Sequence, residues 1–130
     1  MRRWRGFLLL VAILAMVACS SVVDPSDNKT EQVTGSIELL GSGPVHTFSV
    51  SKRGEYSLLL NTLTPATGSL IALQFGQIVA STCGYFTVVA ARIGTPALSG
   101  PIEKGTYCFT LSDPGTLTQP ETYTLTISYP

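Results

Sequence analysis

The C-terminal quarter of the chain carries two runs in which apolar and small polar residues alternate, at residues 105–111 and 123–129. The apolar positions are Tyr107, Phe109, Leu111, Tyr123, Leu125, Ile127 and Tyr129. Because successive side chains of a strand point to opposite faces, each run predicts a strand with one apolar face and one face of mostly hydroxyl groups. Asp113-Pro114-Gly115 breaks the chain between them. The two runs predict an antiparallel sheet that packs its apolar face inward.

Further strand-like segments precede these runs, with glycine and proline turns between them. They cover residues 33–40, 46–50, 56–60, 70–75 with 78–80, and 87–93, and Gly76 is a candidate bulge. Residues 94–101 contain two prolines and are expected to be loop. The pattern predicts an all-β fold, an antiparallel jelly-roll-like β-sandwich of seven to eight strands after an N-terminal signal helix. The predicted core is Phe48, Leu58, Leu60, Ile71, Leu73, Tyr107, Phe109, Leu125 and Ile127.

The first 18 residues have the order of an export signal. Arg2, Arg3 and Arg5 precede the apolar residues 7–18. This apolar run is shorter than the roughly 20 residues that a transmembrane helix needs, and small residues follow it. We therefore expect a cleaved secretory signal rather than an uncleaved anchor. Residues 19–32 are polar and without periodicity, which predicts a flexible tether, and residues 33–130 are expected to form the sandwich domain.

The charge balance changes once the leader is set aside. The whole chain has 8 basic and 8 acidic residues, and from Cys19 onward 5 basic and 8 acidic residues remain, so that 5 − 8 gives a net charge of −3. No basic patch remains, and nucleic acid is therefore not an expected partner.

The end of the leader, Met16-Val17-Ala18-Cys19, resembles a bacterial lipoprotein signal, with Met16 in place of the usual leucine. The resemblance implies cleavage before Cys19, diacylation of that cysteine and attachment to a membrane of the cell envelope. Ser20 after the cysteine implies the outer membrane in Gram-negative lipoproteins. Asn28-Lys29-Thr30 matches a glycosylation sequon. We expect it to be silent in a bacterial lipoprotein.

The later part of the chain, from about residue 35 to 129, resembles bacterial pre-peptidase C-terminal domains and similar jelly-roll modules of envelope proteins. The resemblance is carried by His46-Thr47-Phe48-Ser49-Val50, by Gly54, and by residues 56–60, 105–107 and 123–127. The usual Asp-x-Asp-Leu strand of that family is replaced by Ser69-Leu70-Ile71-Ala72-Leu73. A metal role attached to those acids is therefore not expected here.

Two cysteines remain once Cys19 is assigned to the leader. Cys83 and Cys108 form an even pair in an exported domain, which predicts a disulfide. By loop-closure entropy such a bridge stabilises the fold by roughly 3–4 kcal/mol. Two free buried thiols are the alternative. A metal site is a poorer one, because two thiolates and a distant histidine make an incomplete ligand set.

No set of residues in the sequence assembles a catalytic or cofactor site. His46 is the only histidine, and no nucleophile elbow accompanies it. The carboxylates Glu38, Glu55, Glu103 and Glu121 are expected to be solvated edge charges, and Asp113 stands alone. We predict no metal and no cofactor.

The aromatic pair Tyr85-Phe86 follows Cys83-Gly84 and is the one candidate ligand contact. On a loop held by a disulfide the two rings could stack on a ligand. Burial of both in the core is the favoured prediction, because large aromatic side chains are mostly buried.

The sequence therefore predicts a non-catalytic, lipid-anchored envelope protein whose sandwich binds a protein or glycan or acts structurally. The alternative is a small secreted hydrolase that uses His46 as its general base. The ligand and the oligomeric state do not follow from the sequence.

Overall fold

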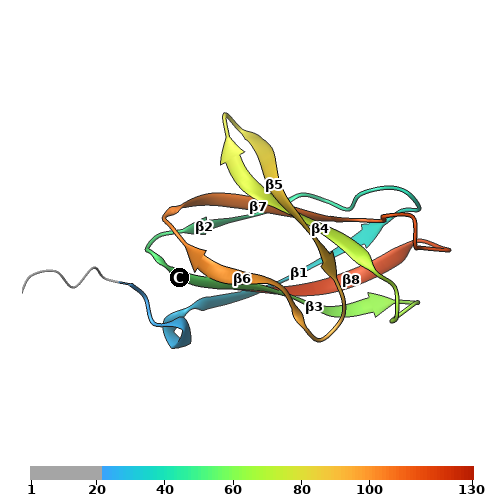
Figure 1. The fold of residues 1–130 in the computed structure, drawn as a ribbon, viewed down its shortest axis with the longest axis horizontal. Coiled ribbons are helices and arrows are strands. Elements are labelled where there is room, and N and C mark those ends of the chain that lie inside the picture. Colours follow the sequence, from blue (N-terminus) through green and yellow to red (C-terminus); the bar gives the residue numbers. More distant parts are fainter. Residues whose placement is uncertain (1–21) are drawn as a thin grey trace, which may run out of the picture.

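The computed structural model describes residues 22–130, so the predicted leader at residues 1–18 and Cys19 lie outside the described residues. This part of the chain contains a 3-10 turn, η1 (Pro25–Asp27), and eight strands. The strands are β1 (Lys29–Ile37), β2 (His46–Val50), β3 (Gly54–Thr64), β4 (Ile71–Val79), β5 (Thr82–Ala91), β6 (Pro96–Ile102), β7 (Gly105–Ser112) and β8 (Glu121–Tyr129). They form two four-stranded antiparallel sheets packed as a sandwich, which confirms the predicted fold class (Figure 1).

The strands are wound as a jelly roll. Sheet A has the order β1-β8-β3-β6, and sheet B has the order β2-β7-β4-β5. β1 pairs with β8, β2 with β7, β3 with β6 and β4 with β5. This nesting arises when one long antiparallel hairpin is wrapped around a core, as in double-sheet jelly rolls. It brings the first and last strands of the domain side by side.

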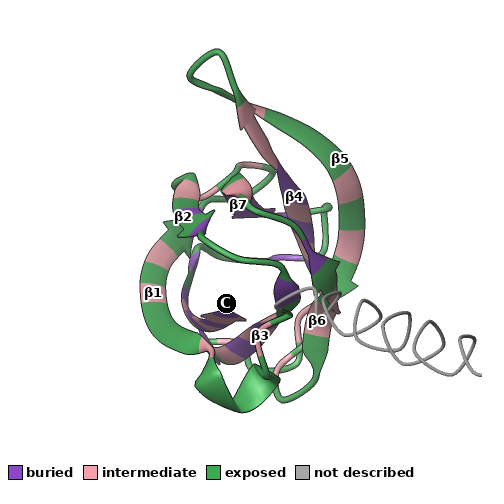
Figure 2. Ribbon diagram, turned by 90° about the vertical axis from the view of Figure 1, so that its left-hand side faces the viewer, coloured by how far each residue is buried: buried purple, intermediate pink, exposed green. Residues whose placement is uncertain are grey.

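The space between the sheets is filled by the residues that alternation predicts to point inward. All nine predicted core residues are buried: Phe48, Leu58, Leu60, Ile71, Leu73, Tyr107, Phe109, Leu125 and Ile127. The ring of Tyr107 stacks between those of Phe48 and Phe75, with centroid distances of 5.8 and 5.7 Å. Figure 2 shows the buried segments of both sheets facing this interior. The inward face of each core strand was thus predicted correctly.

β6 corrects the expectation that residues 94–101 form a loop. This strand contains Pro96 and Pro101 and pairs with β3 at the edge of sheet A. An edge strand needs backbone donors on one side only, so a proline can be tolerated there although it would interrupt a central strand. The prolines therefore indicated an edge position rather than the absence of a strand.

β1 begins at Lys29, four residues before the expected start at residue 33, and ends at Ile37 rather than at residue 40. The residues directly before it also contact the sandwich, since the backbone N–H of Val23 donates to the carbonyl of Arg53 at 2.9 Å. The part of the predicted tether that the structure describes is therefore ordered against the domain.

The predicted bulge at Gly76 is confirmed, although the extra residue lies on the partner strand. The register of β4 against β5 shifts between Phe75 and Gly76, which pair with Thr87 and Tyr85. Phe86 is the residue left without a partner. A bulge of this kind bends the strand and increases its twist, and the β4–β5 hairpin projects from the sandwich in Figure 1.

Candidate functional site

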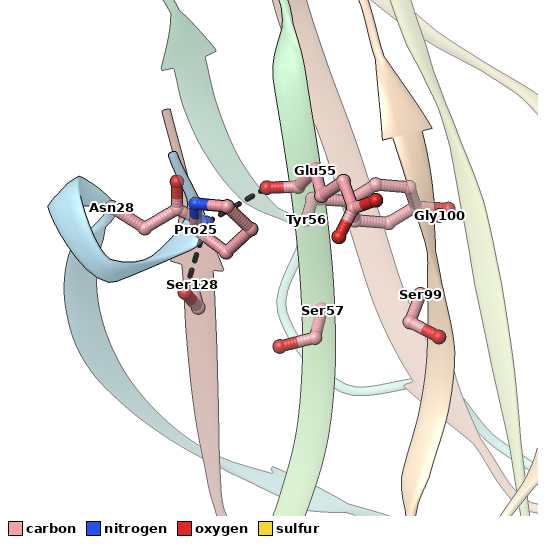
Figure 3. A pocket seen from close by; sticks show the side chains of 8 residues that line it. All are labelled: Pro25, Asn28, Glu55, Tyr56, Ser57, Ser99, Gly100 and Ser128. Carbon is pink, nitrogen blue, oxygen red and sulfur yellow. Dashed lines mark hydrogen bonds between the residues drawn. The ribbon is translucent and has the colours of Figure 1, made fainter. Parts of the chain in front are cut away.

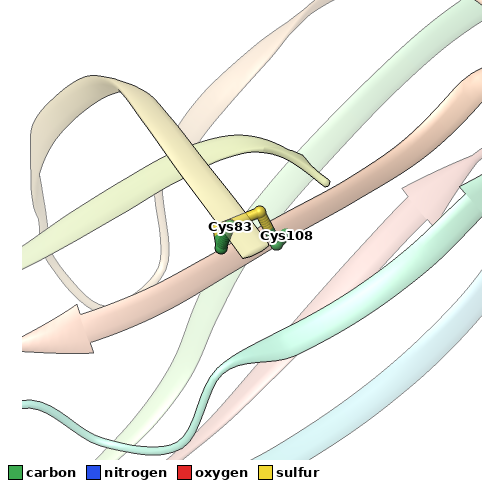
Figure 4. Close-up of a disulfide and its surroundings, with 2 residues drawn as sticks. All are labelled: Cys83 and Cys108. Atoms are coloured by element: carbon green, nitrogen blue, oxygen red, sulfur yellow. A yellow bond between two sulfur atoms is a disulfide. The ribbon is translucent and has the colours of Figure 1, made fainter. Parts of the chain in front are cut away.

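The predicted disulfide joins β5 to β7 across β4. The Cα atoms of Cys83 and Cys108 are 5.9 Å apart, and the two sulfurs are bonded (Figure 4). Gly76 of β4 pairs with Cys108. A Cβ atom on Gly76 would lie 2.1 Å from the carbonyl oxygen of Gly84, so only glycine allows β5 to approach this closely. The bridge attaches the projecting hairpin to the body of sheet B.

Tyr85 and Phe86 lie on strand β5 and not on a loop. Their side chains are 39% and 63% exposed, so the favoured prediction that both are buried is wrong. The Phe86 ring makes an edge contact with the Phe75 ring of the core, at 5.6 Å between centroids. The physical reason is that β5 is the edge strand of sheet B and bulges at Phe86, which moves the aromatic pair away from the interior.

His46 begins β2, and its ring packs on Phe109 with 5.1 Å between centroids. Its Nε2 atom lies 2.7 Å from the hydroxyl oxygen of Tyr123. Burial lowers the pKa of His46 and raises the pKa of Tyr123 to about 12, so both groups are uncharged at neutral pH. Among residues 22–130 no carboxylate is hydrogen-bonded to this ring. In the same part of the chain, no three His, Cys, Asp or Glu side chains are grouped so as to hold a metal ion.

Two carboxylates have a structural role, because they accept hydrogen bonds from backbone N–H groups. Glu121 is 2% exposed, which corrects the expectation of a solvated edge charge. Both of its carboxylate oxygens accept the backbone N–H of Ala66, at 3.1 and 3.0 Å. Asp113 accepts backbone N–H groups of four residues, Leu40, Gly115, Thr116 and Leu117. These hydrogen bonds lower the pKa of the Asp113 carboxyl, and the bond from Leu40 has the largest effect.

The outer face of sheet A is lined by hydroxyl groups in rows that cross the strands. The first row is Thr30, Ser128, Ser57 and Ser99. The other rows are Thr34, Thr124 and Thr62, and then Ser36, Thr122 and Thr64. Between the first and second rows, Thr126 pairs with Gln32 and Leu59 and donates to the Asn61 side-chain oxygen at 2.6 Å. Along β8 the first row lies about 13 Å from the second and the second about 6.6 Å from the third, and neighbouring strands are about 4.8 Å apart.

This face, which we call the hydroxyl face, carries little charge. Every residue of β1 and β8 that belongs to the rows is serine or threonine, and Glu55 is the charged residue that borders the first row. Its members are half-buried or exposed, and on β8 they alternate with buried residues. The alternation of residues 123–129 predicted one strand of the hydroxyl face. The pairing of β1 and β3 with that strand, and of β6 with β3, could not be read from the sequence.

Two hollows lie along the hydroxyl face. One has a volume of about 410 Å³ and is lined by Thr34, Gly35, Ser36, Thr62, Thr64, Thr122, Tyr123 and Thr124. The other has a volume of about 340 Å³ and is lined by Pro25, Asn28, Glu55, Tyr56, Ser57, Ser99, Gly100 and Ser128 (Figure 3). Hydroxyl, amide and carboxylate groups thus line the second hollow, and hydroxyl groups dominate the first.

Asn28, the residue of the predicted sequon, forms part of the second hollow. Its amide nitrogen donates to the Glu55 carbonyl at 2.8 Å and to the Ser128 hydroxyl at 3.2 Å (Figure 3). Its side-chain oxygen is buried and has no hydrogen-bond partner within residues 22–130. The amide that a glycan would modify is therefore held against the sheet.

No family model matches the chain, and no curated protein matches it either. Within residues 22–130 there is no helix that is long and apolar enough to cross a membrane.

Proposed function

We propose that this protein is a non-catalytic lipoprotein of the cell envelope whose β-sandwich binds a neutral glycan through the hydroxyl face. Residues 1–18 act as the signal, and Cys19 carries the lipid after cleavage. The resemblance to pre-peptidase C-terminal domains supports an exported binding module. The serine after the lipidated cysteine supports the outer membrane as its location. The single observation that carries the glycan assignment is the set of hydroxyl rows with their two hollows.

A neutral glycan fits the chemistry of this face. Each serine or threonine hydroxyl can donate one hydrogen bond and accept others, which are the same capacities that a sugar hydroxyl has. The rows repeat along and across the strands, so a polymer with repeated hydroxyl groups can make many similar contacts. A strongly charged ligand would find few charged partners on this face, since Glu55 is the charged residue that borders it. The contacts are weak singly, and affinity comes from their number.

The environment of His46 supports a non-catalytic role. A general base needs a ring nitrogen within reach of the substrate proton and a group that orients the ring. Here Nε2 is engaged with Tyr123, and the ring packs on Phe109. The alternative hydrolase would require this packed pair to open. Substrate turnover that His46→Ala abolishes would favour that alternative.

The glycan assignment is tested by co-sedimentation with an insoluble neutral polysaccharide. Thr124→Lys places a long charged side chain in the middle of the hydroxyl face and should weaken retention by about tenfold or more. Thr47→Lys is the matched control, because Thr47 is exposed on the other sheet and pairs with Cys108. Equal retention of both variants, or no retention of the unaltered protein on any neutral polysaccharide tested, would refute the assignment.

The lipid anchor is tested by the mass of the mature protein and by its partition into detergent. Diacylation at Cys19 should add two acyl chains, which together attach a protein stably where one chain does so only marginally. Cys19→Ala should leave the precursor uncleaved at this site or release a water-soluble form. An unmodified Cys19 in a mature protein found in the aqueous phase would contradict the proposal.

A further inference from the structure

The four edge strands of the sandwich differ in how they are protected from pairing with another chain. β1 carries Lys29 and Glu31, β6 contains Pro96 and Pro101, and β2 has only five residues. Charge, proline and shortness are the usual means by which an exposed edge avoids another strand. β5 is ten residues long and contains neither a charged residue nor a proline. Its bulge at Phe86 is its one irregularity.

The five residues after the bulge form a regular strand that is exposed at Val88 and Ala90 and buried at Ala91. Thr87 to Ala91 pair in continuous register with Phe75 to Ile71 of β4. Within residues 22–130, β5 pairs only with β4, and no backbone hydrogen bond outside the sheets reaches it. Alternate residues of such a strand direct their N–H and C=O groups outward, where a further strand can bind them.

The side chains beside this edge are apolar and exposed. Val88 is 65% exposed, and Tyr85 and Phe86 stand next to it on the same strand. An apolar hollow of about 190 Å³ adjoins Val88 and Ala90 and is lined also by Leu70, Ala72 and Pro114. Figure 2 shows β5 running along the margin of the sandwich, with most of its length exposed. The exposed edge of β5 thus combines backbone hydrogen-bonding groups with apolar side chains that a further strand can contact.

We propose that two copies of this chain associate through their β5 strands, paired antiparallel, so that the two copies of sheet B become one continuous sheet. Twofold pairing of a strand with itself brings its own residues opposite one another. A charged strand would then place like charges together. β5 avoids that repulsion, because Thr82 to Ala91 carry no charge, and unlike β6 it has no proline in the strand. The exposed aromatic pair of each copy would lie beside the strand of the other.

The test is sedimentation equilibrium of the mature protein in density-matched detergent over a range of protein concentrations. The unaltered protein should show a dimer that dissociates on dilution. Val88→Lys should raise the dissociation constant by at least about tenfold, because twofold pairing brings the two lysines together. Val45→Lys is the matched control, since Val45 is also exposed but precedes β2, and it should dimerise normally.

Two further measurements separate a loss of dimerisation from a loss of folding and locate the interface on β5. Circular dichroism verifies that Val88→Lys is folded, and Ala90→Lys serves as a second variant on the same edge should Val88→Lys fail to fold. Amide hydrogen exchange at residues 87–91 should slow as the dimer forms, because their outward N–H groups become bonded. A monomer at all concentrations, a dimer that the β5 lysines leave intact, or unchanged exchange at residues 87–91 would overturn the proposal.

Discussion

At the scale of single residues, the buried carboxylate of Glu121 has the clearest energetic consequence. It satisfies the backbone N–H of Ala66 with both oxygens. Glu121→Ala removes the acceptor and should destabilise the fold by about 1–3 kcal/mol. Chemical denaturation measures the change, and Glu38→Ala at an exposed position is the control, with an expected effect within about 0.5 kcal/mol. Equal effects of the two substitutions would show that the Glu121 bonds contribute nothing to stability.

His46 predicts a pH dependence of stability near neutrality. Burial lowers the pKa of the folded-state ring below 6.5, so the unfolded chain binds the proton at a higher pH than the folded chain does. The stability is therefore complete above the unfolded pKa and decreases as the pH falls through about 6.5. The melting temperature should drop between about pH 7.5 and about pH 5.5. His46→Gln should show a smaller drop, because its amide does not titrate in this range, and an identical drop would contradict the explanation.

At the scale of the elements, the β4–β5 hairpin depends on the disulfide. Cys83 and Cys108 lie on β5 and β7, and the bridge closes a loop with a sequence separation of 25. The double variant Cys83→Ser and Cys108→Ser should lose roughly 3–4 kcal/mol of unfolding free energy, since the unfolded chain regains its freedom. Thermal and denaturant unfolding measure the loss. A bridge that contributes no stability would leave the variant with the melting temperature of the oxidised protein.

The strands could be predicted where the pattern of burial and the strand propensity agree. They could not be predicted at the sheet edges, where prolines and exposed apolar residues are tolerated. β2, β7 and β8 follow from their alternation, and β2 was predicted with its observed bounds. β6 was missed because its prolines are compatible with an edge strand, a position that depends on long-range pairing with β3. The same long-range information decides that Tyr85 and Phe86 are exposed, since β5 has a neighbour on one side only.

At the scale of the whole molecule, the two sheets are held together by one continuous core. Phe109 is fully buried near its centre, between the rings of His46 and Phe48. Phe109→Ala should lower the free energy of unfolding by about 3–5 kcal/mol, because the missing ring leaves a cavity between rigid sheets. Denaturant titration provides the value. A change below about 1 kcal/mol would mean that the site collapses or that the core is less tightly packed than its burial indicates.

The jelly-roll winding also determines which surfaces exist. The sequence shows that residues 123–129 alternate, but the hydroxyl face arises only when β1 and β3 pair with β8 and β6 pairs with β3. The hollow around Asn28 depends in addition on η1, whose Pro25 lines it. Composition and periodicity could therefore predict the fold class and the core. The surface on which the proposed function rests required the register of the strands.

Binding of a neutral glycan to the hydroxyl face can be observed residue by residue with nuclear magnetic resonance. The ¹⁵N-labelled protein is titrated with a soluble neutral glucan, and the shifts of the backbone amides are followed. Binding at the hydroxyl face should give saturable shifts on β1, β3 and β8 around Thr34, Thr62 and Thr124, with the outer face of sheet B unchanged. Shifts centred on β5, or no shifts at saturating glucan, would contradict it.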